Sequence, residues 1–103
     1  MSDPEARANK IRSIQEAVAS MFGLSPEELR QGSSRHVVAL PRQIAMYLAK
    51  QMTDASLPEI GRHFGGRHPT TVMHSIAKIH KLRSSEVELD HAVNKLLTSL
   101  ARR

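Results

Sequence analysis

Apolar residues recur at helical spacing along almost the whole chain, and the recurrence predicts where its elements begin and end. The first segment predicts an amphipathic helix over residues 9–22, which Gly23 ends, and its apolar positions are Ile11, Ile14, Val18 and Met21. Residues 1–8 show no such spacing and are expected to be a flexible N-terminus. A single helical domain is therefore expected over residues 9–101.

Three serines precede helical segments in the pattern of a capping box. In this motif a Ser side chain and the Glu three residues later each accept a hydrogen bond from the other's backbone N–H. The pairs are Ser25 with Glu28, Ser56 with Glu59, and Ser85 with Glu88. They predict a short second helix ending near Gln31, a fourth helix over residues 57–64, and a sixth helix near the end of the chain.

The middle of the chain predicts two more helices. Residues 32–40 (GSSRHVVAL) lack helical spacing and are predicted to form a loop, after which Pro41 opens a third helix. Gly65 and Gly66 end the fourth helix, because glycine tolerates the left-handed backbone that helix ends commonly need. A fifth helix then runs from Pro69 to about Leu82. The predicted fold class is all-α, with about six helices.

The segment over about residues 57–82 has the spacing of a helix-turn-helix, two short helices joined by a turn with glycines. In that motif the N-terminal residues of the second helix face base edges in the major groove. The first turn of this helix suits a phosphate, because its N–H groups lack partners and the helix dipole is positive there. Arg67 adds a charge, and Thr70 and Thr71 are short donors. The alternative is that the glycines and Pro69 only end and begin helices.

The net charge of +5 is concentrated in the middle of the chain. Between residues 30 and 83 nine Lys and Arg residues accompany only two acidic residues, whereas the flanks carry more acidic than basic residues. This distribution favours a polyanionic partner such as nucleic acid, although a membrane surface would also suit it.

Other functional classes find no support in the sequence. The absence of cysteine excludes a disulfide framework, a Cys-based zinc site and a thiol nucleophile. The spacing of His63 and His68 matches no common metal-ligand pattern, and there are no paired carboxylates, nucleophile elbow or cofactor loop, so neither a metal, a cofactor nor enzyme activity is predicted. No apolar run is long enough to span a bilayer, and the polar N-terminal residues MSDPEARANK do not have the apolar segment expected of a signal peptide. The expected localisation is cytoplasmic, in association with the nucleoid, without membrane contact.

Residues 42–79, RQIAMYLAKQMTDASLPEIGRHFGGRHPTTVMHSIAKI, resemble the C-terminal DNA-binding domain of the bacterial chromosomal replication initiator DnaA. The segments PRQIAMYLAK, SLPEIG, FGGR and TTV carry the resemblance, which extends more loosely from about residue 11 into the last helix. It implies a Trp-repressor-like helical fold and sequence-specific binding of double-stranded DNA at the initiator's boxes in a replication origin.

The resemblance also implies roles for particular residues. The loop before the third helix inserts an arginine into the minor groove in this family, and this chain offers Arg35. The family positions that contact the phosphate backbone correspond to Arg42, Gln43, Lys50, Ser56, Leu57 and Pro58. Those that begin the recognition helix in the major groove correspond to Arg67, His68, Pro69, Thr70 and Thr71.

The chain departs from the family in three respects. His68-Pro69 replaces the usual Asp-His, and an imidazole offers different hydrogen bonds from a carboxylate, so a shift of base preference is expected. The loop carries Arg35 alone, where family members often cluster several cations. The chain also has no GxxxxGK[ST] motif, the phosphate-binding loop of the family's ATPase module, so it is not expected to bind ATP by that route. Whether it is a fragment of an initiator or a stand-alone relative stays open at this point.

Two alternative functions also stay open. The first is a non-specific or retargeted DNA-binding regulator, including one that occupies initiator sites without ATP-driven assembly. The second is a protein-interaction module that competes with or modulates the initiator. For that role the sixth helix would dock a partner or a second copy, instead of closing the core, through Val87, Leu89, Val93, Leu96, Leu97 and Leu100.

Overall fold

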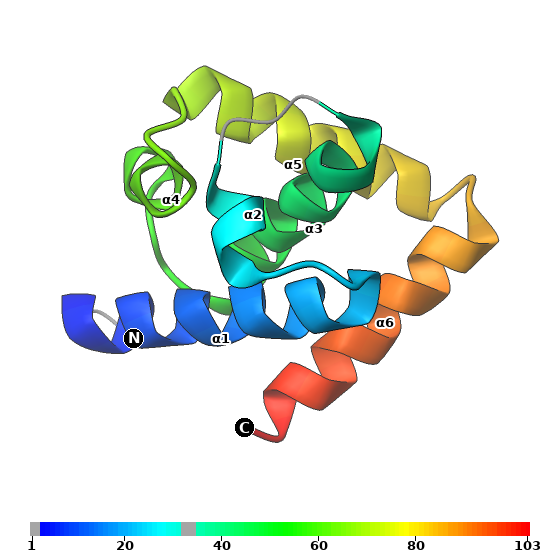
Figure 1. Cartoon of the computed structure of the whole chain (residues 1–103), viewed down its shortest axis with the longest axis horizontal. Coiled ribbons are helices and arrows are strands. Elements are labelled where there is room, and N and C mark those ends of the chain that lie inside the picture. The colour runs from blue at the N-terminus through cyan, green and yellow to red at the C-terminus, as the bar shows by residue number, and fades with distance from the viewer. Residues whose placement is uncertain (1–2, 32–34) are drawn as a thin grey trace.

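The structure is a computed structural model that describes residues 3–31 and 35–103. Within these residues it contains six helices and no strand, which confirms the all-α prediction (Figure 1). The helices are α1 (Pro4–Phe22), α2 (Pro26–Arg30), α3 (His36–Met52), α4 (Leu57–His63), α5 (Pro69–Arg83) and α6 (Val87–Ala101).

The first helix begins earlier than its apolar spacing predicts. Asp3 caps α1 by accepting a hydrogen bond from the N–H of Glu5 at 3.0 Å, and Pro4 occupies the first turn. The prediction of a flexible N-terminus is therefore wrong for residues 4–8, while residues 1 and 2 lie outside the described part. Two features stabilise this first turn: the cap by Asp3, and the contact of Arg7 with the carboxylate of Glu59 on α4. Gly23 ends α1 in the left-handed conformation, as predicted.

The third helix also begins early, at His36 and not at Pro41. The loop prediction is thus wrong for residues 36–40, and residues 32–34 lie outside the described part. Pro41 cannot donate the helical hydrogen bond to the residue four positions before it, yet the helix continues through it. Val38 is buried and Leu40 packs against the core, so apolar contacts stabilise the turn that precedes the proline.

The three expected capping boxes have different outcomes. The box of Ser25 and Glu28 forms completely. Ser56 caps α4 as expected, but the carboxylate of Glu59 accepts from Nε of Arg7 at 3.0 Å and makes no reciprocal cap. The third box is wrong, because α6 begins after Glu86, which makes no side-chain cap.

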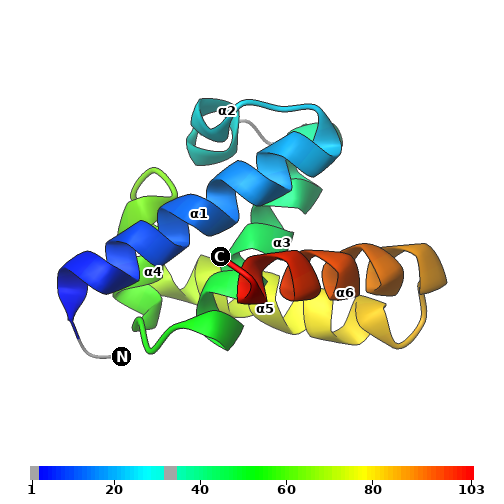
Figure 2. The same ribbon diagram turned by 90° about the horizontal axis from the view of Figure 1, so that it is seen from below.

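The core is built around α3, which packs against both α1 and α5, and α6 runs back beside α5 to close it (Figure 2). Val93, Leu96 and Leu100 of α6 are buried, and Leu89 and Leu97 pack against the core. The apolar face of α6 is therefore used inside the domain. Val87 is the exception, with 68% of its surface exposed.

Candidate nucleic-acid interface

The turn between α4 and α5 is organised by Gly61. Its carbonyl accepts hydrogen bonds from the backbone N–H groups of Phe64, Gly66 and Arg67, at 3.1, 3.0 and 2.9 Å. The same glycine packs so closely that a Cβ atom would overlap the carbonyl oxygen of Arg67. The direction in which α5 leaves the turn is therefore fixed by backbone contacts with the last turn of α4.

The two glycines after Phe64 have the backbone conformation that the sequence predicts. Gly65 and Gly66 have φ values of 79° and 77°, in the left-handed region. Gly65 also packs against the carbonyl of Arg30 so tightly that a side chain would overlap it. Phe64 is fully buried and anchors the turn to the core. Helix α4, the turn and α5 thus form the helix-turn-helix expected over residues 57–82.

The start of α5 is capped by a histidine. His68 is the N-cap residue, and its Nδ1 accepts a hydrogen bond from the N–H of Thr70 at 3.0 Å. Because Nδ1 accepts, the proton of the neutral ring is assigned to Nε2, which is a donor. The imidazole therefore replaces an aspartate as a cap, while presenting a donor where a carboxylate presents an acceptor. Thr70 and Thr71 are exposed beside it, and Pro69 is partly exposed.

Two arginines expected to contact DNA converge on one carbonyl group. Nη1 of Arg42 and Nη2 of Arg67 each donate to the carbonyl oxygen of Gln31 at 3.2 Å. Arg42 is only 5% exposed, whereas Arg67 is partly exposed. Burial, and then the charge of Arg67, lower the pKa of Arg42. Arg42 thus connects α3 to the end of α2, and its contact with phosphate stays a prediction.

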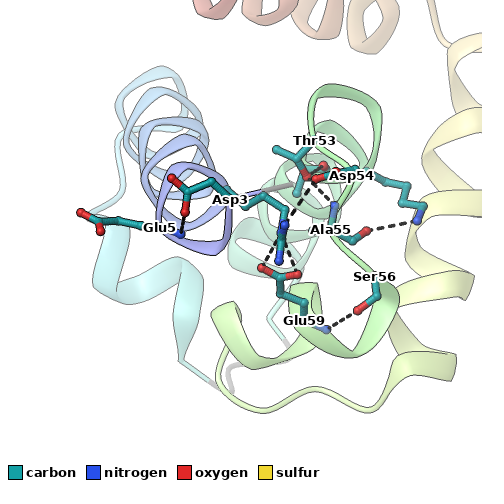
Figure 3. Close-up of polar contacts among 10 residues, drawn as sticks. Asp3, Glu5, Thr53, Asp54, Ala55, Ser56 and Glu59 are labelled. Carbon is teal, nitrogen blue, oxygen red and sulfur yellow. Dashed lines mark hydrogen bonds and ion pairs between the residues drawn. The ribbon is translucent and has the colours of Figure 1, made fainter. Parts of the chain in front are cut away.

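The residues expected to contact phosphate from the α3–α4 turn gather at the start of α4. Figure 3 shows this turn, with Ser56 beside Glu59. Nζ of Lys50 donates to the carbonyl of Ala55 at 3.1 Å, and Lys50 is exposed. Of the two residues after Ser56, Leu57 is partly buried and Pro58 is exposed.

The remaining predicted contacts come from α3. Arg35 is exposed and directly precedes the helix, and its carbonyl accepts from the N–H of Ala39 at 2.7 Å. Gln43 is partly buried, and its Oε1 has no hydrogen-bond partner among the described residues. The minor-groove role of Arg35 stays a prediction, since the neighbouring residues 32–34 lie outside the described part.

The far end of α5 carries a different kind of arginine. Arg83 donates to Asp90 at 2.7 Å, to the hydroxyl of Tyr47 at 2.9 Å and to Asn94 at 2.5 Å. Its guanidinium carbon also lies 5.7 Å from the centre of the Tyr47 ring. The hydrogen bond with Asp90 contributes most to a raised pKa of Arg83. This arginine joins α5 to α3 and α6.

Sequence reasoning missed Gly61 and Gln31. A glycine inside a short capped helix is a signal of close backbone approach, and SLPEIG contains it. The role of Gln31 has no comparable signal, because the group that orders the arginines is its main-chain carbonyl.

The described residues form neither a metal site nor a membrane-spanning helix. In residues 3–31 and 35–103 no three His, Asp or Glu side chains are grouped in a way that could hold a metal ion. None of the helices found there combines the length and apolar character needed to cross a bilayer.

Comparison with known proteins gives the same family from three directions. A family described as "Bacterial dnaA protein helix-turn-helix" matches residues 11–79. The "Chromosomal replication initiator protein DnaA" of Agrobacterium fabrum is 48% identical over 92 residues, which cover 89% of this chain and 19% of that protein. The protein of the same name from Lactobacillus delbrueckii subsp. bulgaricus is 43% identical over 98 residues, or 95% and 22% of the two chains.

A solved structure agrees with these sequence matches. The chain superposes on the "crystal structure of DNA replication initiation factor" with a TM-score of 0.81 and 29% identity. The match covers 91% of this chain and 29% of that one. The chain thus spans only about a fifth of the length of the relatives that it matches in sequence.

Proposed function

The chain belongs to the bacterial DnaA helix-turn-helix family, a DNA-binding module, and from this membership we propose that it binds double-stranded DNA with sequence specificity. The observation that carries the proposal is the exposed start of α5. Arg67, the Nε2 donor of His68 and the hydroxyls of Thr70 and Thr71 are presented together at the positive end of a helix. These are donors that suit base edges and phosphates.

The proposed mechanism divides the work between two kinds of contact. The start of α5 enters the major groove and recognises bases, while Arg35 probes the adjacent minor groove. Lys50, together with the start of α4, binds the phosphate backbone without reading sequence. If about six phosphates are neutralised, the logarithm of the affinity falls with the logarithm of the salt concentration with a slope of about −5.

The biological setting that we propose is recognition of initiator boxes at a replication origin. The relatives that support it are named chromosomal replication initiators, and this chain matches about a fifth of their length. The chain lacks the P-loop motif of an ATPase, so its proposed contribution is recognition of DNA. Association with the nucleoid follows from that contribution.

Fluorescence anisotropy tests this function directly. A labelled duplex that carries the family's initiator box is compared with a base-scrambled duplex of equal length at one salt concentration. We expect the box to bind more tightly by more than about tenfold, which is a difference of about 1.4 kcal/mol. Equal affinities would contradict box recognition and favour retargeted or non-specific binding, and a selection from random sequences would then separate these two.

The cap of α5 gives a second test that concerns specificity. His68→Asp keeps a side chain that can accept from the first-turn N–H groups, but it replaces the Nε2 donor with an acceptor. We expect it to change the ranking of single-base variants of the duplex. The control Lys50→Gln is expected to weaken all duplexes alike. An unchanged ranking with His68→Asp would show that this side chain does not contact a base.

A further inference from the structure

A polar groove lies between α1, α2 and the end of α4, helices that Figure 2 shows from the side of α1. Its volume is about 550 Å³, and its polar lining includes Arg12, Gln15, Arg30, Arg62 and His63. None of these residues is among those proposed above to contact DNA. The groove is therefore a feature that the proposed function does not use.

One wall of the groove is fixed by a buried side chain. Gln15 is only 3% exposed, and its Nε2 donates to the carbonyl of His63 at 2.7 Å. Its Oε1 accepts from Nη1 of Arg30 at 3.1 Å. The close packing of Gly65 on the carbonyl of Arg30 fixes the backbone beside it. The guanidinium of Arg30 is thus oriented before any ligand arrives, which reduces the entropy lost on binding.

The other two arginines of the groove are exposed. Within residues 3–31 and 35–103 neither Arg12 nor Arg62 forms an ion pair, and Arg12 donates to the side chain of Asn9 at 3.1 Å. The acidic groups nearby are Glu16, which lines the groove, the exposed Glu27, 3.8 Å from Arg30, and Glu59, which acts on His63 and is paired with Arg7. Three arginines line the groove, Arg12, Arg30 and Arg62, against the carboxylate of Glu16, so the lining has a net positive charge.

The imidazole of His63 completes the lining. Burial lowers its pKa, and the charges of Arg62 and Arg12 lower it further, against the opposing effect of Glu59. The neutral ring therefore predominates near neutral pH and retains one N–H donor. Arg12 and Arg62 place positive charge near this ring.

We propose that this groove binds a phosphate group. The planar guanidinium forks of three arginines match the geometry of phosphate oxygens, and such charge-assisted hydrogen bonds are stronger than neutral ones. A concave groove with one preoriented fork and two exposed ones suits a tetrahedral anion, with Arg30 as the fixed point. The phosphate has two possible sources, a small phosphate in solution or a backbone phosphate of DNA.

The first arm of the test uses inorganic orthophosphate, and it does not depend on DNA binding. The side-chain amide of Gln15 and the ring of His63 are followed by NMR while orthophosphate is added, against sodium chloride of equal ionic strength. We expect saturable shifts with a dissociation constant of about 1–10 mM. The double variant Arg12→Gln/Arg62→Gln is expected to weaken binding at least about tenfold, whereas Lys81→Gln, an exposed cation outside the groove, leaves it unchanged.

The second arm identifies DNA as the source, and it rests on the proposed function. The same double variant is compared with the wild-type chain on a duplex limited to the box and on one extended at both ends. Loss of affinity on the extended duplex alone, with a salt slope shallower by about one for each phosphate contact removed, assigns the groove to the DNA backbone. Thermal unfolding checks that the variant is folded. Chloride-like shifts in the first arm, together with unchanged affinity for both duplexes, would overturn the proposal.

Discussion

The two ends of α5 differ in what their polar side chains contact. At the start, Arg67 and Arg42 donate to the same carbonyl oxygen. His68, Thr70 and Thr71 are exposed, so their side-chain donors are accessible to solvent. At the far end, each of the three guanidinium nitrogens of Arg83 donates to a side chain of α3 or α6: a carboxylate, a phenol and an amide.

Charge alone does not identify a binding surface on this domain. Both ends carry an arginine, and both lie beside a turn. The difference is that the partners of Arg83 belong to the fold, whereas the start of α5 has donors in excess of the acceptors around it. We infer that the far end stabilises the domain and that the start binds DNA.

The largest effect is expected from Gly61→Ala, which disturbs the turn that positions the start of α5. The new methyl group would overlap the carbonyl of Arg67, so we expect a loss of about 3 kcal/mol in the free energy of unfolding, measured in urea. Gly66→Ala is the matched control, because open space surrounds that glycine. It incurs only the cost of a left-handed alanine, about 1–2 kcal/mol. Equal losses would contradict the proposed overlap.

The next effect separates binding from stability. Arg67→Ala is expected to weaken binding to the box duplex about thirtyfold, or about 2 kcal/mol, if the guanidinium contacts a base edge. The free energy of unfolding is expected to change by about 1 kcal/mol or less, since the hydrogen bond that Arg67 loses within residues 3–31 and 35–103 is the one to Gln31. Anisotropy and urea unfolding measure the two quantities. An unchanged affinity would show that Arg67 does not contact the DNA.

Arg83→Ala is expected to have the opposite signature. It removes the Arg83 donor from the buried Tyr47 and from Asp90, whose carboxylate keeps only the longer hydrogen bond from Asn94 at 3.4 Å. We therefore expect the free energy of unfolding to fall by about 1.5 kcal/mol, a value that allows for the partial exposure of this ion pair. The affinity of the folded chain for DNA is expected to stay the same. Lys81→Ala, on the same helix but exposed, serves as the control. A large loss of affinity with Arg83→Ala would make the far end of α5 part of the interface.

The smallest effect concerns pH and the turn before α5. The pKa of His63 is lower in the folded chain than its ordinary value of 6.5, so the unfolded chain binds more protons as the pH falls through that value. Stability is therefore expected to decrease from about pH 7.5 to pH 5, by about 0.5 kcal/mol or less from this group because solvent screens it. His63→Gln is expected to reduce the decrease, as measured by urea unfolding across this pH range. A steeper decrease of stability with falling pH in His63→Gln would contradict a lowered pKa of His63 in the folded chain.

The helix ends that could be predicted from the sequence are those fixed by hydrogen bonds between residues within a few positions of one another. Ser25 and Glu28 form their box because both partners lie within one turn, and Gly23 ends α1 for an equally local reason. In the Ser56 box, the carboxylate of Glu59 does not accept a hydrogen bond from the backbone N–H of Ser56. It accepts instead from Nε of Arg7, which is 52 residues away in the sequence. The early start of α3 likewise depends on the tertiary contacts of Val38, which no local pattern reports.

The candidate site shows the same division. The exposed start of α5 could be predicted, because glycines, a proline and threonines in that order indicate a turn followed by a helix N-terminus. The burial of Arg42 could not, since its partner is the main-chain carbonyl of a residue on another helix. The cap made by His68 was missed because histidine is not among the usual N-cap residues.

Mapping which end of α5 touches DNA is the most direct test of the account. Backbone amide resonances of the wild-type chain are followed by NMR while the box duplex is added at low salt. The account predicts that the largest shifts fall on residues 67–72 and 35–36, with residues 80–86 almost unchanged. Shifts concentrated on residues 80–90, with residues 67–72 unaffected, would contradict the assignment of the two ends.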